Sequence, residues 1–537
     1  MNGQRLFAIT FLAICGLAIG LRAPHLNRRP MHGDEAVHAV RWEELRQTGR
    51  YVYDPYEYHG PTLYYATFPA ALMRGFPPFA ATDAAMYRSV PVAFGVGSVL
   101  LLLLLTPALG RPATVAAALL TAVSPAMVFY SRYYIQETLL VFFTLLAIAA
   151  GWRGALAATT RRRGAAAGWS ILLGAALGCM QATKETCIIV VACLVTALTV
   201  ALAAQRRTVS RLALGHALRA AAWALPVAVA VSVLLFAGPG GHWSNVVDSF
   251  RAYRVYIERA GGGIHTHPWY YYLSLLLYTR AAPGPAWSEA LIVMSGLLGA
   301  VVTFGGRRAP ARATSASPEL TQLQILSKSG LARFLAIYTF LLLAVYSAIP
   351  YKTPWCVLGP LHGLILLAGI GIGWLWNIMP GRPAWAVLAV AFLAGAGHLA
   401  WQAWRGSHDE VFCTDPRNPY VYAHPVRDVE RLAEDMERLA QVHPAGRKLL
   451  IRVIAPNPWP LPWYLRAFPH VGYYEQVPAD ADADVIVVST AQQSALEAVL
   501  RKAYDGPTYR GLRRDEILAI YVRRPEPQEL ECDRGSR

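Results

Sequence analysis

Long apolar runs alternate with short polar segments from the start of the chain to about residue 404. A helix that crosses a bilayer needs about 20 mostly apolar residues, because the hydrocarbon region offers its backbone no water. Eleven runs meet this requirement, so the pattern predicts a polytopic α-helical membrane protein. The runs lie near residues 6–26, 86–109, 112–130, 135–156, 167–184, 186–204, 219–238, 286–305, 331–349, 354–376 and 383–404.

The pattern changes after residue 404. Apolar positions recur at helical spacing in two segments, and short apolar runs typical of buried strands occur in three others. The helices are predicted at 426–442 and 494–501, and the strands at 448–455, 484–490 and 516–524. Helices that alternate with strands indicate a small α/β domain. The sequence therefore predicts a transmembrane domain over residues 1–404, followed by an α/β domain over residues 405–537.

The chain is basic, with 49 Lys and Arg against 33 Asp and Glu, yet only 15% of its residues are charged. A basic balance often indicates nucleic-acid binding. Here the basic residues gather in alternate loops, as the positive-inside rule describes, so we expect no nucleic-acid partner. They are Arg111, Arg161, Arg162, Arg163, Arg206, Arg207, Arg211, Arg219, Arg307, Arg308, Arg312, Lys328, Arg333 and Arg382.

With eleven spans, these loops and the N-terminus lie on the cytoplasmic side of the cytoplasmic (inner) membrane. The loops 27–85 and 239–285 and the domain from residue 405 are then extracytoplasmic. Residues 35–48 and 62–74 have helical periodicity, and we expect both helices to lie along the membrane interface.

The sequence also raises two points about a cytoplasmic loop and a pair of cysteines. The cytoplasmic loop RRAPARATSASPELTQ (307–322) is polar and is predicted to be flexible. Cys413 and Cys532 lie near the two ends of the α/β domain. A disulfide between them is compatible with an extracytoplasmic domain, and the sequence leaves open whether it forms.

Polar groups gather at the predicted outer ends of the spans. Ionisable residues near the bilayer core are unfavourable unless they are paired or solvated, so they are functional candidates. Five separate segments supply them. The candidates are Asp34, Glu35, His59, Arg132, Glu137, Lys184, Glu185, Tyr351 and Lys352. We expect the acidic pair after the first span and the acidic residue of the fourth to share one external cavity with basic side chains.

Each candidate also has a structural interpretation. Asp34 and Glu35 could cap the helix that follows them, since carboxylates favour helix N-termini. Glu137 could pair with Arg132 or hydrogen-bond Tyr133 on its own helix. The lysines could be interface anchors. Anchors alone would not need so many carboxylates beside them, so we favour a functional role for the set.

Transfer of a sugar from a lipid phosphate would use groups of this kind. The departing phosphate needs cations, which Arg132, Lys184 or Lys352 could supply. The acceptor hydroxyl needs a base, which Asp34 could be.

A second outer loop contains an HxH pair, His265 and His267, followed by the aromatic run 269–272. A lone HxH pair is a weak metal signal, and we favour a loop or acceptor-site role. The aromatic run fits a membrane-interface belt as well as a sugar platform.

Several motifs resemble those of the GT-C superfamily of membrane glycosyltransferases. An acidic pair after the first span and a later HPP-like element, here His59-Gly60-Pro61, resemble the protein O-mannosyltransferases and aminoarabinose transferases. SRYYIQETLLVFFTLLA (131–147) resembles their next motif, with Glu137 where those families have Asp. The chain is more similar to the flippase-activity-associated, mannosyltransferase-like membrane proteins of bacteria and archaea. The segments that carry this similarity are GDEAVHA (33–39), YDPYEYHGPTLYY (53–65), SRYYIQE (131–137), ATKE (182–185), YKTPW (351–355), NPYVYAHP (418–425) and PWPLPWYLR (458–466).

The resemblance implies a polyprenyl-phosphate-sugar donor and an inverting transfer on the outer face of the membrane. It makes Asp34 the base or an acceptor-positioning group, Glu35 a residue that organises the loop or assists a metal, and Glu137 a support for the acceptor or a metal. Some GT-C enzymes use a divalent ion and others none, so a metal at Asp34 and Glu137 stays open. The residues expected to bind substrate are His59, Arg132, Lys184, Glu185, Tyr351, Lys352, His265 and His267.

Two other classes of function remain open. An accessory or flippase-associated protein could bind lipid-linked sugars through the same cations without chemistry. A structural or sensor protein could bind a glycan or protein partner through the Trp459 and Trp463 cluster of the tail, although we prefer ordinary loop packing for these rings. The membrane lipid and a polyprenyl-phosphate sugar are the expected partners, and the acceptor, which could be a protein, a lipid or a glycan, is unknown.

Overall fold

The computed structural model describes residues 3–57, 59–204, 207–263, 265–305 and 318–524. The chain divides into two compact units. The first comprises Met1–Leu26, Glu44–Leu72 and Ala85–Tyr422, and the second comprises Asn27–Glu43, Met73–Ala84 and Ala423–Arg537.

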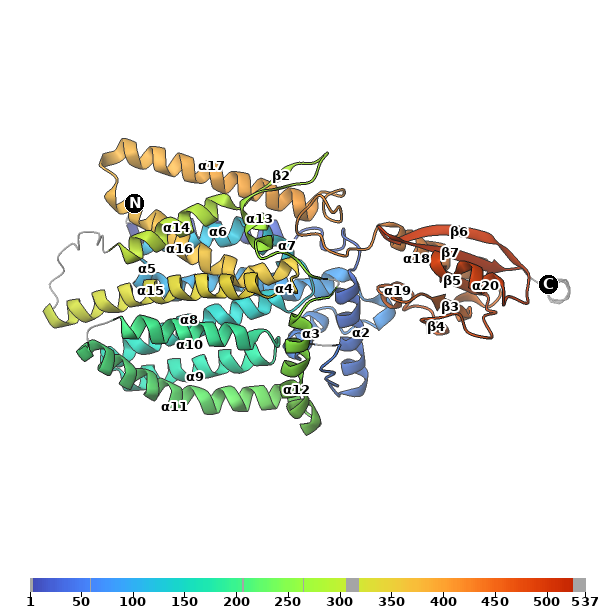
Figure 1. The fold of residues 1–537 in the computed structure, drawn as a ribbon, viewed down its shortest axis with the longest axis horizontal. Helices are drawn as coiled ribbons and strands as arrows, with labels where there is room; N and C mark the ends of the chain where they lie inside the picture. The colour runs from blue at the N-terminus through green and yellow to red at the C-terminus, as the bar shows by residue number, and fades with distance from the viewer. Residues whose placement is uncertain (1–2, 58, 205–206, 264, 306–317, 525–537) are drawn as a thin grey trace. The chain divides into compact units, whose positions relative to one another are not determined.

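The first unit is a bundle of apolar helices (Figure 1). Among the described residues, eight helical stretches are long and apolar enough to cross a membrane. They are α1 (Gly3–Arg22), α4 with η2 and α5 (Ala84–Leu109), α8 (Glu137–Thr159), α9 (Arg163–Gln181), α11 (Arg207–Ala237), α15 (Pro318–Ala348), η3 with α16 (Pro354–Ile378) and α17 (Gly381–His408). The shorter apolar helices α10 (Cys187–Ala203) and α14 (Ala290–Phe304) complete the set with a bent pair described next. Each predicted apolar run contains an apolar helix, and the multi-pass helical fold is confirmed. By length and composition, eight of the described helical stretches, or nine with the bent pair, could cross a membrane, against the eleven predicted.

One predicted span is broken rather than continuous. The run 112–130 folds as α6 (Arg111–Val123) and α7 (Pro125–Ser131), which are bent by 57°. The break falls at Ser124, because Pro125 has no backbone N–H to continue the ladder of α6 and suits the first turn of a new helix. The Ser124 side chain accepts a hydrogen bond from the Met127 backbone at 3.4 Å, which caps α7.

Small residues set the distances between the helices of the bundle. α9 packs against α11, and a Cβ atom placed on Gly174 would lie only 2.3 Å from the carbonyl oxygen of Ala224. α14 packs against α16 in the same way, since a Cβ on Gly299 would lie 1.9 Å from the Leu367 carbonyl oxygen. Such close backbone approach is the usual basis of helix association in membranes.

The turns at one end of the bundle are joined by hydrogen bonds. Thr62 at the start of α3 (Thr62–Leu72) donates its backbone N–H to Ala182 at 3.0 Å, in the turn between α9 and α10. Lys352 donates its backbone N–H to His265 at 2.9 Å, which links the α15–α16 turn to the loop after α12 (Trp243–Ala260). The first unit therefore gathers the turns from which most of the candidate residues come.

The second unit contains a five-stranded mixed sheet with the order β4-β3-β5-β7-β6. β3 pairs in parallel with β4 and β5, while β7 is antiparallel to β5 and β6. The strands are β3 (Ile451–Ile454), β4 (Val471–Tyr474), β5 (Val485–Ser489), β6 (Tyr504–Arg513) and β7 (Glu516–Arg523). α18 (Asp428–Val442) packs on one face and α20 (Gln493–Glu497) on the other. This confirms the predicted α/β domain; β4 and β6 are additional strands.

Segments of the first outer loop belong to the second unit. The predicted helices near 35–48 and 62–74 are α2 (Gly33–Thr48) and α3, and α2 begins within this unit. The domain boundary predicted between residues 404 and 405 falls inside α17, and the first unit continues to Tyr422.

Two expectations concern residues outside the description. Residues 306–317 of the polar cytoplasmic loop are not among the described residues, although Pro318 already begins α15. Cys413 is buried, but Cys532 lies outside the described residues, so their disulfide stays an open question.

Candidate functional site

A buried ion pair lies at the turn end of the first unit. Lys184 sits between α9 and α10 and donates its ammonium group to Oε1 of Glu137, the first residue of α8. Both residues are only 6% exposed. Burial by itself would lower the pKa of the Lys184 ammonium group, but the nearby Glu137 carboxylate raises it, so the lysine stays charged. Oε2 of Glu137 is buried and has no hydrogen-bond partner among the described residues.

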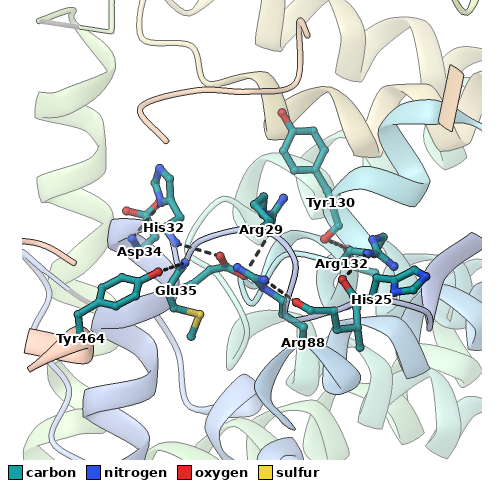
Figure 2. Close-up of polar contacts among 12 residues, drawn as sticks. His25, Arg29, His32, Asp34, Glu35, Arg88, Tyr130, Arg132 and Tyr464 are labelled. Carbon is teal, nitrogen blue, oxygen red and sulfur yellow. Dashed lines mark hydrogen bonds and ion pairs between the residues drawn. The ribbon is translucent and has the colours of Figure 1, made fainter. Parts of the chain in front are cut away.

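Arg132 contacts the backbone after the first span. Its guanidinium donates to the carbonyl oxygens of Arg22, Pro24 and His25 at 2.5, 2.7 and 3.2 Å. Figure 2 shows the contact with His25. The arginine thus holds the end of α1, and the ion-pair partner of Glu137 is Lys184.

A narrow cavity of about 30 Å³ adjoins the ion pair. This volume holds roughly two water molecules. Besides the ion pair, its lining has polar groups from Thr144, Thr186, Tyr338, Tyr346 and Cys356 and apolar side chains that include Leu140, Val141, Val190 and Leu358. The charged groups therefore face a space with mixed walls from α8, α10, α15 and α16, in which aliphatic and aromatic side chains predominate.

Glu185 forms a second buried network with the first outer loop. Tyr53 donates its hydroxyl to Oε1 of Glu185 at 2.7 Å, and Nδ1 of His59 lies 2.7 Å from Oε2. The hydroxyl of Tyr256 in α12 lies 2.9 Å from the same His59 nitrogen. Burial favours the neutral acid, but His59 and the hydrogen bond from Tyr53 lower the pKa of Glu185, which stays ionised.

Close packing explains why position 60 of the His59-Gly60-Pro61 element is a glycine. A Cβ atom on Gly60 would lie 2.2 Å from the carbonyl oxygen of Ala182, well inside van der Waals contact. The loop can approach the α9–α10 turn only because this position has no side chain. The two predicted motifs HGP and ATKE are therefore packed directly together.

The HxH pair packs against the Tyr351-Lys352 turn. Nζ of Lys352 donates to the carbonyl oxygen of His267 at 3.1 Å and also to that of Ile349. The His267 ring stacks on Tyr271 with the ring centres 4.3 Å apart, while the His265 ring meets Tyr351 edge-on at 5.0 Å. Burial, with His265 and Lys352 nearby, lowers the pKa of His267. Burial likewise lowers the pKa of Lys352.

The acidic pair is divided between two environments in the second unit. Glu35 is fully buried and accepts hydrogen bonds from the His32 backbone at 3.0 Å and from Arg29 at 3.4 Å (Figure 2). The side chain of Asp34 is 48% exposed, and its backbone N–H donates to Nδ1 of His32 at 3.0 Å. Both carboxyl groups lie in the first turn of α2. Glu35 orders the loop, whereas Asp34 is accessible. Glu137 belongs to the other unit, so the expected common cavity stays a prediction.

Among the described residues, no group of three or more His, Cys, Asp or Glu side chains could hold a metal ion. Glu137 is paired with Lys184, and Glu35 already accepts from Arg29 and a backbone N–H. A metal at Asp34 and Glu137 stays an open prediction, and no step below runs through one.

The buried carboxylate of Glu289 was not predicted from the sequence. It accepts hydrogen bonds from the Ser124 hydroxyl at 2.5 Å, from the Ala126 backbone at 3.0 Å and from the Tyr420 hydroxyl at 2.7 Å. Burial raises the pKa of this carboxyl group. Glu289 precedes α14 directly, so an acidic residue at the start of an apolar run was the available signal. It joins the α6–α7 break to the chain near Tyr420.

Trp463 of the tail is packed rather than presented as a binding platform, whereas Trp459 is half-buried. Trp463 is 4% exposed. The Arg466 guanidinium lies over its ring at 3.8 Å, and the Phe79 ring lies 5.9 Å away within the same unit. The preference for loop packing is correct for this ring.

Comparison with known proteins identifies the fold. The crystal structure of ArnT from Cupriavidus metallidurans in the apo state matches with 14% identity and a TM-score of 0.59, covering 97% of this chain and 98% of that one. ArnT bound to undecaprenyl phosphate matches with 15% identity and a TM-score of 0.58, covering 97% and 99%. The archaeal oligosaccharyltransferase AglB from Archaeoglobus fulgidus, in complex with an inhibitory peptide and a dolichol-phosphate, matches with 12% identity and a TM-score of 0.57, covering 98% and 77%. The chain has the GT-C membrane fold.

The sequence adds a more local similarity. Residues 67–238 match the family model PMT, described as dolichyl-phosphate-mannose-protein mannosyltransferase. This region contains Arg132, Glu137, Lys184 and Glu185 but ends before the HxH pair and begins after Asp34. No curated protein matches the sequence. The predicted resemblance to the GT-C superfamily is confirmed by the fold and by this matched region.

Proposed function

We propose that this protein is a membrane glycosyltransferase that moves a sugar from a polyprenyl-phosphate donor to an acceptor on the outer face of the cytoplasmic membrane. The matched family acts with dolichyl-phosphate-mannose, and the similar structures carry undecaprenyl phosphate or dolichol-phosphate. The single observation that carries the proposal is the buried Lys184–Glu137 pair, which places a charged ammonium group and its carboxylate partner beside a largely apolar cavity. A lipid phosphate needs this combination of a charged head site and apolar surroundings.

The proposed reaction is a direct displacement. The acceptor hydroxyl oxygen forms a bond to the anomeric carbon, and the bond from that carbon to the phosphate oxygen breaks. The electron pair stays on the departing phosphate, where Lys184 stabilises the charge. The hydroxyl proton passes to the carboxylate of Asp34, the exposed member of the acidic pair, and Glu35 keeps its loop in place.

The second buried network supports the acceptor side of this proposal. His59 is the partly exposed member, with its side chain 23% exposed, while Glu185 and Tyr53 are buried beneath it. A histidine held by an ionised carboxylate in this way offers a fixed polar contact to a hydroxyl-bearing acceptor. We also propose Tyr351, Lys352, His265 and His267, which contact one another as described above, as substrate-binding residues.

The orientation belongs to the same proposal. The Arg111 guanidinium lies over the ring of Phe7 at 5.8 Å, so the basic loop after α5 is at the N-terminal end of α1. We propose that this end is cytoplasmic. A cysteine introduced at Lys502 should then react in intact cells with a membrane-impermeant maleimide, while one at Arg162 should react only after lysis. The reverse labelling would overturn the orientation.

The transferase proposal is tested with the purified full-length chain in liposomes. The substrates are a panel of radiolabelled polyprenyl-phosphate hexoses and pentoses, with membranes that carry the native acceptors. Lys184→Met should lose nearly all transfer, because a neutral side chain cannot stabilise the departing phosphate. Lys502→Met, at an exposed position in the tail, is the matched control and should transfer normally. Unchanged transfer by Lys184→Met would contradict the proposal.

An accessory protein that only binds lipid-linked sugars makes the opposite prediction. It would bind the labelled donor and release no polyprenyl phosphate from it in any variant. The comparisons do not favour this alternative, because the matched family is one of transferases.

A further inference from the structure

The C-terminal domain contacts the loop that carries the acidic pair. Within the second unit, the backbone N–H of Met31 donates to the hydroxyl of Tyr464 at 2.9 Å. Tyr464 is the last residue of the short helix α19 (Leu461–Tyr464). Met31 is only 1% exposed, so this donor depends on the tyrosine rather than on water.

Two more contacts hold the same loop. The Arg427 guanidinium, just before α18, donates to the carbonyl oxygen of Arg28 at 3.1 Å. The His424 ring lies 4.9 Å from the ring of His32, whose Nδ1 accepts the backbone N–H of Asp34. The tail thus contacts this loop at three points: the Met31 backbone N–H, the Arg28 carbonyl oxygen and the His32 ring.

The residue next to Asp34 touches the tail directly. A Cβ atom built on Gly33 would lie 3.6 Å from Cβ of Trp459. Despite these contacts the Asp34 side chain stays 48% exposed, while Met31, His32 and Glu35 are all buried. The tail therefore contacts the buried part of this loop, and the Asp34 carboxylate stays accessible to solvent.

The domain holds a second part of the first outer loop in the same manner. Arg466 donates through Nε to the carbonyl oxygen of Phe79 at 3.2 Å and through a terminal nitrogen to that of Thr82 at 2.7 Å. These carbonyl groups lie at the short 3-10 helix η1 (Phe79–Ala81). The tail is therefore bound to this outer loop both before α2 and before α4.

We propose that the C-terminal domain is the positioning element of the acidic loop, with Tyr464 as its main positioning residue. The domain fixes residues 31–33 and so sets the direction of the Asp34 side chain. This inference rests on the proposed function, since it concerns the group that takes the acceptor proton there. It assigns the tail a part in the transfer step rather than a separate binding activity.

A pair of cysteines tests the contact without any assay of transfer. Cβ atoms joined by a disulfide are roughly 3.5–4.5 Å apart, which the Gly33 and Trp459 positions satisfy. The double variant Gly33→Cys/Trp459→Cys, in the full-length chain in liposomes, should form a disulfide under mild oxidation, seen by mass spectrometry of the linked peptides. The two single variants are the controls. Failure of the pair to link would overturn the proposal.

The linked enzyme then tests whether the contact persists during turnover. If the tail positions the loop, the oxidised double variant should transfer sugar as fast as the same protein after reduction. Transfer that disappears on oxidation and returns with reductant would mean that the loop must leave the tail, and would overturn the proposal.

Tyr464→Phe tests the positioning residue itself. Loss of one hydrogen bond to a backbone donor should lower kcat about five- to tenfold and leave KM for the labelled donor unchanged. Tyr509→Phe, whose hydroxyl bonds only to the Gln493 side chain among the described residues, is the matched control and should behave as wild type. An unchanged kcat in Tyr464→Phe, or a rise in KM alone, would count against positioning.

The two levels of failure are distinguishable. If the wild-type chain transfers no sugar from any donor, the proposed function fails, and the disulfide result still reports on the contact. If wild type transfers and the cysteine pair does not link, only the positioning role fails.

Discussion

At the residue scale, a buried ion pair behaves differently when one partner or both are removed. Lys184 and Glu137 are both nearly inaccessible, and either one alone would be an uncompensated charge. Removing one partner of such a pair typically destabilises a protein by about 3–5 kcal/mol, whereas replacing both is often tolerated. Single and double variants of this pair can therefore distinguish its effect on stability from its effect on sugar transfer.

The double variant Lys184→Met/Glu137→Gln should unfold at a temperature close to that of wild type, while each single variant unfolds at a clearly lower one. Sugar transfer should nevertheless be lost in the double variant, because the phosphate site has lost its cation. Thermal unfolding in detergent and transfer in liposomes measure the two effects. A stable double variant with normal transfer would show that the pair is only structural.

Glu185 predicts a dependence on pH. Its folded pKa lies below the ordinary value of 4.5, so the ionised network stabilises the fold above that pH. The contribution should be lost as the pH falls through the folded pKa. Melting temperatures of wild type and Glu185→Gln should therefore differ most above pH 4.5 and converge in more acidic solution. A difference that stays constant across this window would contradict the assigned charge state.

At the element scale, the break between α6 and α7 is stabilised by hydrogen bonds to Glu289, which precedes α14. Glu289 accepts from Ser124 at the break, from the Ala126 backbone in the first turn of α7, and from Tyr420 beyond α17. α7 ends at Ser131, next to Arg132, and α8 begins with Glu137. The geometry of this short helix therefore sets where both of these side chains lie.

Glu289→Ala should destabilise the protein by several kcal/mol, because up to three buried donors lose their acceptor, each worth roughly 1–3 kcal/mol. Glu289→Gln should be milder, since its amide keeps one acceptor oxygen. Glu437→Gln, on the surface of α18, is the control variant for a Glu-to-Gln change and should unfold nearly as wild type does. Denaturation of the detergent-solubilised chain checks the order, and equal effects of the alanine and glutamine changes would contradict the account.

The sequence predicted the spans well, because a run of apolar residues has one stable solution in a bilayer. The break at Ser124 escaped prediction because Pro125 and its neighbours are as apolar as a continuous helix. β6 escaped because its residues are polar and half exposed, with glycine and proline among them. Such an edge strand depends on pairing with β7 rather than on burial.

The candidate residues were predicted better than their partners. The sequence marked both Glu137 and Lys184, but an ion pair between positions 47 residues apart follows only from the packing of α8 against α9. Local spacing suggested Arg132 as the partner of Glu137, and that arginine instead holds the backbone after α1. Glu289 lacked a motif around it and could be found only from its three buried donors.

At the scale of the whole molecule, the two units contribute different parts of the proposed reaction. The first contains the cation and its cavity, and the second contains the exposed carboxylate on a loop held by the tail. The proposal assigns the phosphate site to Lys184 and the base to Asp34. Transfer should therefore require the full chain.

The most direct test is transfer by Asp34→Asn. The purified full-length variant is compared in liposomes with wild type and with Asp505→Asn, a control at a well-exposed position of β6. Loss of a general base should slow release of polyprenyl phosphate by roughly 10²–10⁴-fold while labelled donor still binds. Asp505→Asn should match wild type. Transfer by Asp34→Asn at the wild-type rate would contradict the account.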